Sequence, residues 1–558
     1  MKTNKIKSIF KNAWLLLAAL TLVSSCSDAL DLEPETTWAI DNFYKTESDM
    51  DIAFAGIYAT LRGLYGGDLI LMDAGTDESY AFKGWVEQSP TNLYTHDETT
   101  EDVGDLWRVL HIGINNCNNM IKHLLPETFE EEDYNRYIAE ARFLRAYMYF
   151  ELTTWWNEVP LRLEPTVDQN SNHVAPSSTE EVYMQIIEDL TFAAEHLPSS
   201  FDASYVAGRA NNSAAHAMLA RVYLKAGGYP LQASSINGKN PFEAAKEHCE
   251  VIINQGNHAL NPDYKELFLN YIQNRYDYSE SIFEIVFRNS AALGVNTAGR
   301  NGNWNGLLYK PNPRQATPFG DPEIQPSPVF DLIYELDDLR KSWNTPGISG
   351  AQNNNFPNGK VNVQAGPLSW GYCIGKFRRW EPIYPDDIAA SNLSDTPIIN
   401  LETPEPLQAN NTGINFPLIR FADVLLMFAE AENELNGPGN AIPMLDLVRA
   451  RAGLPGIASV RPEVTTDSDA FFMEIVDERM RELCFEGNRK ADLVRWHLLE
   501  QKLEEFEASV IFNPGYIPEN HTYKLRASTN FDPTKHYSLP YPQQEVLINN
   551  LLEQKSEW

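Results

Sequence analysis

Apolar residues recur at three- and four-residue steps between polar loops over roughly residues 42–256. This spacing puts them on one face of a helix, so it predicts successive amphipathic helices. The clearest helix passes through Tyr137 and Leu152 and is expected to stop near Asn157 and Pro160. Asparagine can take a left-handed cap conformation, and proline cannot continue a helix. We therefore expect a mainly α-helical protein.

A second helical pair resembles a tetratricopeptide hairpin. Its first helix covers 213–224, the chain breaks at Gly227 and Gly228, and the second helix begins at Phe242. Small residues such as Ala244 let paired helices pack closely, as in tetratricopeptide hairpins. Because the spacing is irregular, the sequence predicts tetratricopeptide-like hairpins and not a regular array.

The character of the chain changes between residues 257 and 417. This stretch of 161 residues holds 16 of the 34 prolines, is rich in asparagine, and shows little sustained periodicity. It predicts a loop-rich layer, and long loops inside a compact body usually serve a function. Helices are expected to return at Pro417, to turn at 437–439, and to form a further pair at about 469–506.

The N-terminus has the pattern of a bacterial lipoprotein signal. A lysine-rich start is followed by an apolar run over residues 13–23 and by small residues directly before Cys26. The run is too short to span a bilayer, so we expect residues 1–25 to be removed on export. Cys26 would then be the lipid attachment site, anchoring the protein to a membrane without crossing it.

These features together predict five segments along the chain. They are a lipoprotein signal peptide at 1–25, a lipidated tether at 26–41, a helical tetratricopeptide-like part at 42–256, a loop-rich and ligand-facing region at 257–417, and a helical C-terminal part at 418–558.

The charge of the chain excludes nucleic acid as a partner. Without residues 1–25 the chain carries 40 basic and 77 acidic side chains, a formal charge of −37. A polyanion would be repelled at long range. The acidity also keeps an exported protein soluble.

Four cysteines remain after Cys26, and they are widely separated: Cys117, Cys249, Cys373 and Cys484. They lack the spacing of a zinc site or of a disulfide framework. We expect buried thiols, with at most one or two bridges.

No catalytic motif is present in the sequence. It contains no HExxH helix, GxSxG elbow, Walker loop or EF-hand loop, and its eleven histidines are scattered. Gly299, Gly302 and Gly306 lie in a loop with asparagine and tryptophan, and not between a strand and a helix. With 77 acids, a carboxylate pair for glycoside hydrolysis can be picked anywhere and carries no information. We therefore expect neither an enzyme nor a metal or cofactor site.

Motifs spread over nearly the whole chain carry a resemblance to a known family. In order they are Leu30-Asp31-Leu32-Glu33-Pro34, Phe43-Tyr44-Lys45-Thr46-Glu47, Trp107 with Asn115 and Asn118, Ala139-Glu140-Ala141-Arg142-Phe143-Leu144-Arg145, Asp338-Leu339-Arg340, Gly375-Lys376-Phe377, Arg420-Phe421-Ala422-Asp423, the run from Arg481 to Trp496, and Pro540-x-Pro542 with Asn549 and Trp558. In this order and number they resemble the SusD/RagB family of outer-membrane nutrient-binding lipoproteins from Bacteroidetes. The family commonly has glycine where this chain has Asn157.

The charged residues of these motifs are interpreted as framework. Charged pairs at helical spacing lock one helix to the next, and buried Arg–carboxylate pairs are common structural devices. This interpretation covers Arg142, Arg145, Arg481, Glu482, Glu486, Arg489, Asp492 and Arg495.

The resemblance implies a helical surface protein that binds oligosaccharides or polysaccharides. Such proteins are tethered by lipid to the outer membrane, face the cell exterior, and pass ligands to a SusC-like TonB-dependent transporter. Two alternatives stay open: a peptide- or protein-binding member of the family, and a mainly structural lid of the transporter.

The ligand site is expected on loops that carry aromatic and polar side chains, since sugars offer C–H faces to rings and hydroxyls to polar groups. The candidates are chosen by position: Asp77, Glu78, Tyr80, Trp85 and Tyr94 before Trp107, and Asn301, Trp304, Tyr309 and Trp370 in the middle layer.

Overall fold

A computed structural model gives the fold of the chain. It describes residues 43–68, 74–81, 90–290, 295–310, 318–350, 360–365, 373–383, 393–402, 409–513 and 515–558. The chain divides into two units, Met1–Met50 and Asp51–Trp558. Cys26, the signal segment and the tether lie outside the described residues, so the lipid anchor stays a prediction.

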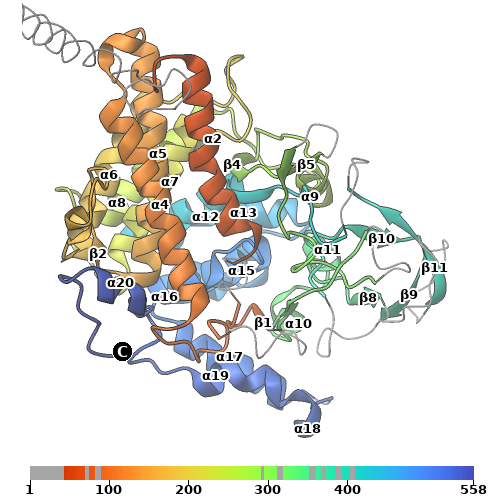
Figure 1. Ribbon diagram of the computed structural model, residues 1–558. Helices are drawn as coiled ribbons and strands as arrows, with labels where there is room; N and C mark the ends of the chain where they lie inside the picture. Colours follow the sequence, from red (N-terminus) through yellow and green to blue (C-terminus); the bar gives the residue numbers. More distant parts are fainter. Residues whose placement is uncertain are drawn as a thin grey trace, which may run out of the picture. The chain divides into compact units, whose positions relative to one another are not determined.

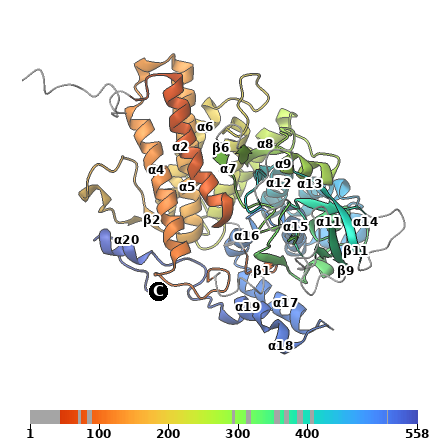
Figure 2. The same cartoon turned by 45° about the vertical axis from the view of Figure 1, so that its right-hand side comes forward.

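The larger unit is built around an array of antiparallel helices, which stand side by side in Figures 1 and 2. Its helices are α4 (Glu101–His123), α5 (Glu131–Trp156), α6 (Thr179–His196), α7 (Asn212–Gly227) and α8 (Pro241–Gln255), and each packs on the next. The chain then leaves the array and returns with α12 (Phe421–Asn436), which packs on α8, and α13 (Pro438–Arg451). The mainly α-helical class is confirmed.

Local sequence signals set the ends of several helices. Ser178 and Glu181 form a capping box at the start of α6, and the Asn211 side chain accepts from the backbone N–H of Ala214 at the start of α7. Asn157 ends α5 with φ 60°, a positive value that asparagine adopts more readily than most residues. Close approach of α7 and α8 needs Gly227, because a Cβ there would lie 2.9 Å from the Phe242 ring.

The prediction that helices return at Pro417 is wrong by four residues. Residues Phe416–Arg420 form the strand β12, which pairs antiparallel with β4 (Ser281–Ile285). All five residues of β12 are buried, and the helix α12 begins only at Phe421. Pairing with a strand more than 130 residues earlier overrides the local apolar pattern.

The middle region contains more regular structure than a loop-rich layer. Its helices are α9 (Tyr264–Ile272), α10 (Phe330–Ile333) and α11 (Leu339–Asn344). A four-stranded sheet has the order β10 (Trp380–Pro382), β11 (Leu393–Asn400), β9 (Lys360–Ala365) and β8 (Ile348–Gly350). Within this region β5 (Arg288–Ser290) pairs with β6 (Val295–Thr297), and β7 (Ile324–Pro326) pairs with the earlier strand β1 (Ser79–Ala81). In the N-terminal part, β2 (Val159–Pro160) pairs with β3 (Pro176–Ser177).

The C-terminal part continues with three longer helices where a pair was expected. They are α15 (Ser468–Leu483), α16 (Arg489–Arg495) and α17 (Leu499–Ile511), followed by the short helices α18 (Pro518–His521), α19 (Arg526–Asn530) and α20 (Gln543–Ile548). Short helical turns link the main elements: α14 (Ile457–Val460) and the 3₁₀ segments Pro126–Thr128, Asn170–Asn172, Pro462–Thr466 and Thr522–Leu525.

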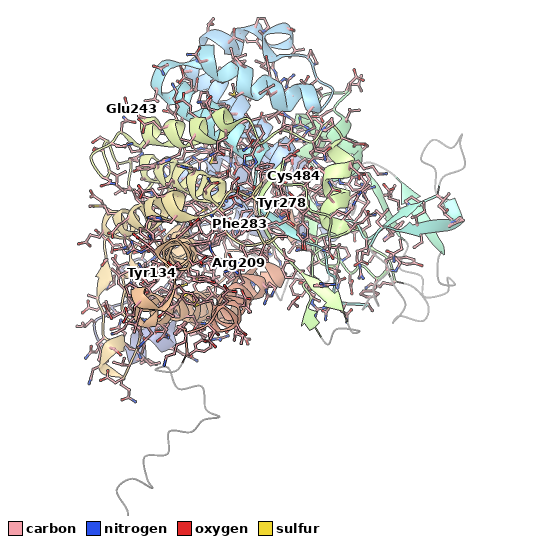
Figure 3. The ribbon with its side chains drawn as sticks, turned by 90° about the horizontal axis from the view of Figure 1, so that it is seen from above. Tyr134, Arg209, Glu243, Tyr278, Phe283 and Cys484 are labelled. Atoms are coloured by element: carbon pink, nitrogen blue, oxygen red, sulfur yellow. The ribbon has the colours of Figure 1, made fainter. Side chains whose placement is uncertain are left out.

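Buried apolar side chains run through the array and through the later elements. Figure 3 places Phe283 and Cys484 in the interior and Tyr134 and Glu243 toward the periphery. Phe283 of β4 meets Phe143 of α5 edge-to-face, with ring centroids 5.2 Å apart. Cys117, Cys249, Cys373 and Cys484 are buried free thiols. Within the described ranges, no helix has the length and apolarity needed to cross a membrane.

Candidate functional site

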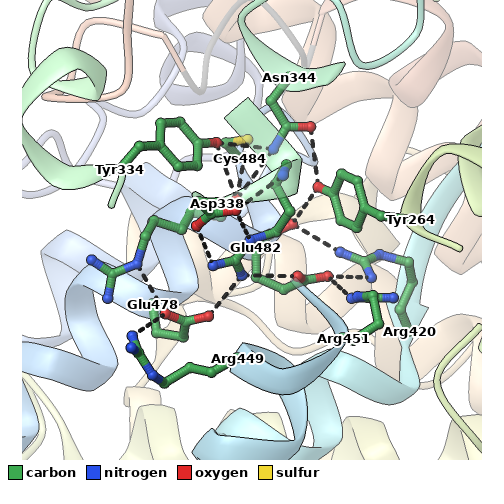
Figure 4. A network of polar contacts seen from close by, with 12 residues as sticks. Tyr264, Tyr334, Asp338, Asn344, Arg420, Arg449, Arg451, Glu478, Glu482 and Cys484 are labelled. Carbon is green, nitrogen blue, oxygen red and sulfur yellow. Dashed lines mark hydrogen bonds and ion pairs between the residues drawn. The ribbon is translucent and has the colours of Figure 1, made fainter. Parts of the chain in front are cut away.

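A buried network of charged side chains joins sequence motifs of the middle and C-terminal parts (Figure 4). Arg340 donates to Glu478 at 2.7 Å and to Glu482 at 3.1 Å. Arg420 donates to Glu482 at 2.9 Å and to Glu486 at 2.7 Å. All these side chains are at most 3% exposed. The framework interpretation is therefore confirmed for Glu482 and Glu486.

In this network, neighbouring positive charges lower the pKa of the carboxyl groups by more than burial raises it. Burial raises the pKa of Glu478, but the positive charges of Arg340 and Arg481 more than offset this and bring the pKa to about 2. Burial also raises the pKa of Glu482, but the positive charges of Arg451, Arg420 and Arg340 hold it well below the usual range. These groups stay ionised and structural at neutral pH.

Arg142 and Arg145 on α5 also belong to the framework. The Arg145 guanidinium donates two hydrogen bonds of 2.8 Å to the buried carboxylate of Asp189 on α6. Arg142 lies 3.9 Å from the same carboxylate. Bidentate pairing of this kind fixes the α5–α6 contact.

Asp77 and Glu78, two of the candidate ligand residues, are buried against the C-terminal part. Asp77 pairs with Arg489 at 2.6 Å, and both side chains are 2% exposed. Glu78 accepts a 2.8 Å hydrogen bond from the backbone N–H of Phe485. The structure gives both carboxylates framework partners.

Tyr80 and Tyr94 are also buried. The Tyr80 hydroxyl contacts the Nζ of Lys524, and its ring lies 5.9 Å from the Phe506 ring. Tyr94 donates a 2.8 Å hydrogen bond to the carbonyl of Gly75 and meets Phe531 edge-to-face. Both rings pack beneath the surface.

Two candidates of the middle layer are buried as well. The backbone carbonyl of Asn301 accepts a 2.7 Å hydrogen bond from the Thr412 hydroxyl. The side-chain oxygen of Asn301 has no hydrogen-bond partner among the described residues. Tyr309 packs on Trp380, with centroids 5.6 Å apart. Trp85 and Trp370 lie outside the described residues, and the ligand roles of all nine candidates stay predictions.

Trp304 differs from the other described candidates because it is partly exposed. It lies in the turn 301–305, and the Arg300 guanidinium carbon is 5.2 Å from its ring centroid. Arg300 donates to the Asn410 carbonyl at 2.9 Å, and Asn303 donates to the same carbonyl at 2.8 Å. A ring, a guanidinium and amide groups therefore meet at one turn.

A π-helical turn, η2 (Leu64–Asp68), supports this site. The Arg300 N–H donates to the Gly66 carbonyl at 2.8 Å. Gly67 lies directly against the Trp304 ring, since a Cβ on Gly67 would come within 2.5 Å of Trp304 Cζ3. Single π-helical turns occur frequently at functional sites. Two segments more than 230 residues apart thus position the Trp304 ring.

Replacing Gly67 with alanine is expected to displace the Trp304 ring. The added methyl group cannot fit at 2.5 Å, and overpacking of this kind costs about 1–3 kcal/mol. A shifted Trp304 indole resonance in an NMR spectrum would report the movement. Gly56→Ala in α2 (Glu47–Gly63) is the matched control, because nothing lies within 4 Å of a Cβ there. An unmoved indole in Gly67→Ala would contradict this packing.

Sequence reasoning missed Gly66, Gly67 and Arg300 as parts of this site. The loop of glycine, asparagine and tryptophan that contains Gly302 was a usable signal. Gly302 has φ 77°, and a Cβ there would lie 2.4 Å from the Phe377 carbonyl oxygen. In the described part of the chain, no group of three or more His, Cys, Asp or Glu side chains is arranged to hold a metal ion.

Comparisons with known proteins agree with this architecture. A family model described as "SusD family" matches residues 397–558, and one described as "Starch-binding associating with outer membrane" matches residues 30–224. SusD-like protein P25 of Formosa agariphila is 26% identical, over 98% of each chain. The starch-binding protein SusD of Bacteroides thetaiotaomicron is 24% identical, over 89% of this chain and 91% of its own.

A solved structure of a SusD homologue from Bacteroides thetaiotaomicron has the same fold. It superposes with a TM-score of 0.75 at 23% identity, covering 93% of this chain and 98% of that chain. The family descriptions name binding and not catalysis, in agreement with the sequence expectation of a binding protein. With matches at both ends of the chain and relatives that span nearly all of it, the chain belongs to the SusD/RagB family.

Proposed function

We propose that this chain is a lipid-anchored glycan receptor of the outer membrane, which captures oligosaccharides outside the cell and passes them to a SusC-like TonB-dependent transporter. The family description, starch binding in association with the outer membrane, supports this function. The starch-binding relative supports a carbohydrate ligand. The lipoprotein pattern ending at Cys26 supports the anchor. The resemblance to the family supports the outward-facing location.

The partly exposed Trp304 ring carries the proposal. Sugars place flat C–H faces on aromatic rings and offer hydroxyls to amides and guanidinium groups. A guanidinium has five N–H donors, and Arg300 is seen to use one of them on the Asn410 carbonyl. Trp304 would therefore stack on a sugar ring while Arg300 binds its hydroxyls.

Trp304→Ala is expected to weaken binding of a recognised oligosaccharide about tenfold, or about 1.4 kcal/mol, because the stacking surface is lost. A glycan array first identifies the ligand, and calorimetric titration of the variant then measures its Kd. Phe512→Ala is the matched control, since Phe512 is 82% exposed at the end of α17 and lies outside the site. An unchanged Kd in folded Trp304→Ala would reject Trp304 as a ligand contact.

Two further measurements, of peptide binding and of co-purification with the transporter, separate the alternatives. Affinity for peptide mixtures with none for glycans would identify a peptide-binding member of the family. Stable co-purification with the transporter and no soluble ligand would identify a structural lid. Either result would overturn the proposed glycan receptor.

A further inference from the structure

A pocket between α5, α7 and α16 contains a lysine without a partner. Lys225 of α7 is 2% exposed, and its Nζ has no hydrogen-bond acceptor among the described residues. The hydroxyl of Thr154, on the facing wall, also has no partner there. The cavity volume is about 60 Å³. At roughly 10–15 Å³ for each water centre, it has room for about four to six waters.

The arginines that line this pocket are already neutralised. Arg221 pairs with Asp423 at 2.6 Å, and Arg479 bonds the same carboxylate at 2.7 Å. Arg495 pairs with Asp492 at 2.8 Å and with Glu430. Three guanidinium groups thus share three carboxylates.

Among the other acidic side chains that line the pocket, one carboxylate has no positively charged partner in the described part of the chain. Glu486 is bonded by Arg420 and Lys376. Glu151 accepts neutral hydrogen bonds from the Tyr65 hydroxyl at 2.9 Å and from the Trp155 indole N–H at 3.3 Å. Within the described residues it has no ion pair. The pocket therefore presents one ammonium, on Lys225, and one carboxylate, on Glu151, that do not bond each other.

We propose that this pocket binds a small free α-amino acid, with its carboxylate on Lys225 and its ammonium on Glu151. Such a zwitterion gives the three N–H groups of Lys225 an acceptor and gives Glu151 a charged donor. It adds no net charge to a buried site, where an uncompensated charge is costly.

Other ligand classes fit the pocket less well. A simple anion would satisfy Lys225 and leave Glu151 facing a second negative charge. A monosaccharide has about twice the number of heavy atoms that the volume holds and no charge for Lys225. The volume limits the ligand to about the size of glycine or alanine.

The pocket is reachable and separate from the Trp304 turn. Trp155 and Glu151 are partly exposed, and a second pocket of about 30 Å³ shares Thr154, Trp155 and Ala491 with the first. Trp304 lines neither pocket, so this inference does not depend on the proposed glycan site. Burial lowers the pKa of Lys225 to about 8 and raises that of Glu151 above its usual value. Affinity should therefore fall above pH 8, as the ammonium loses its proton, and also at acidic pH, as the Glu151 carboxylate takes up a proton.

The test is calorimetric titration of the purified protein with glycine, L-alanine and L-serine, beside acetate and methylammonium as the two halves of the ligand. Saturable binding of at least one amino acid, at least tenfold tighter than either half, is the expected result. No saturable binding of the amino acids would show a water-filled cavity and overturn the proposal. Acetate binding as tightly as glycine would show a simple anion site and also overturn it.

Two variants assign the contacts. Lys225→Met keeps the side-chain volume, and it should abolish amino-acid binding while raising the ligand-free melting temperature, because a buried unpaired ammonium is removed. Glu151→Gln should weaken glycine binding at least tenfold. Trp304→Ala is the control and should bind glycine with the affinity of the wild type. Unchanged glycine affinity in folded Lys225→Met would overturn the assignment.

Discussion

Arg420→Ala is expected to lower the free energy of unfolding by about 3–5 kcal/mol, the cost typical of removing one partner from a buried ion pair. The Arg420 guanidinium is fully buried and donates to Glu280, Glu482 and Glu486 at 2.7–2.9 Å. Its loss would leave these buried carboxylates without one of their cations. Urea unfolding followed by tryptophan fluorescence measures the change.

Two further variants calibrate this result. Arg108→Ala removes an exposed pair with Asp105, whose side chains are 58% and 46% exposed, and should cost at most about 1 kcal/mol. Arg420→Lys keeps the charge but cannot bridge several carboxylates. Its loss of unfolding free energy should therefore lie between those of Arg420→Ala and Arg108→Ala. A loss for Arg420→Ala as small as that for Arg108→Ala would show that the network does not stabilise the fold.

Glu284→Gln is expected to stabilise the protein at pH 8 by about 3 kcal/mol more than it does at pH 4.5. Glu284 of β4 is 5% exposed and accepts hydrogen bonds from Ser281 and, at 2.7 Å, from Asn415. Burial raises its pKa from 4.5 to about 7, and Asp277 adds to the rise. Each pKa unit corresponds to about 1.4 kcal/mol.

The sign follows from the proton count. The folded state holds the Glu284 proton more tightly than the unfolded state, so this contribution to stability is complete below pH 4.5 and is lost as the pH rises through 7. Glutamine does not titrate and avoids that loss. Melting temperatures of the variant and the wild type over pH 4.5–8 test this, with the exposed Glu519→Gln as control. A pH-independent difference would contradict the raised pKa.

Local signals were sufficient to predict much of the helical array. The three- and four-residue periodicity of α5, the cap at Asn157 and the break at Gly227 all act within a few residues of the element they define. Such signals lie in the sequence itself. They failed at β12, where the apolar run that includes Leu418 pairs with β4 as a strand.

The candidate site was predictable only in part. Trp304 was chosen by its loop position, and the structure leaves its ring partly exposed. Tyr80 and Tyr94 were chosen on the same grounds and are 2% and 4% exposed. Residue type and loop position do not distinguish a ring at the surface from one beneath it, because burial depends on which distant segment covers the loop.

The sequence by itself determined the helical succession and the supply of arginines and carboxylates for buried pairs. The tertiary structure alone decided how they are paired. Asp77 meets Arg489 across 412 residues, whereas Lys225 has no hydrogen-bond acceptor in the part of the chain that the structure describes. The reason is physical: periodicity and capping act over one or two helical turns, but desolvation and ion pairing depend on neighbours that only folding brings together.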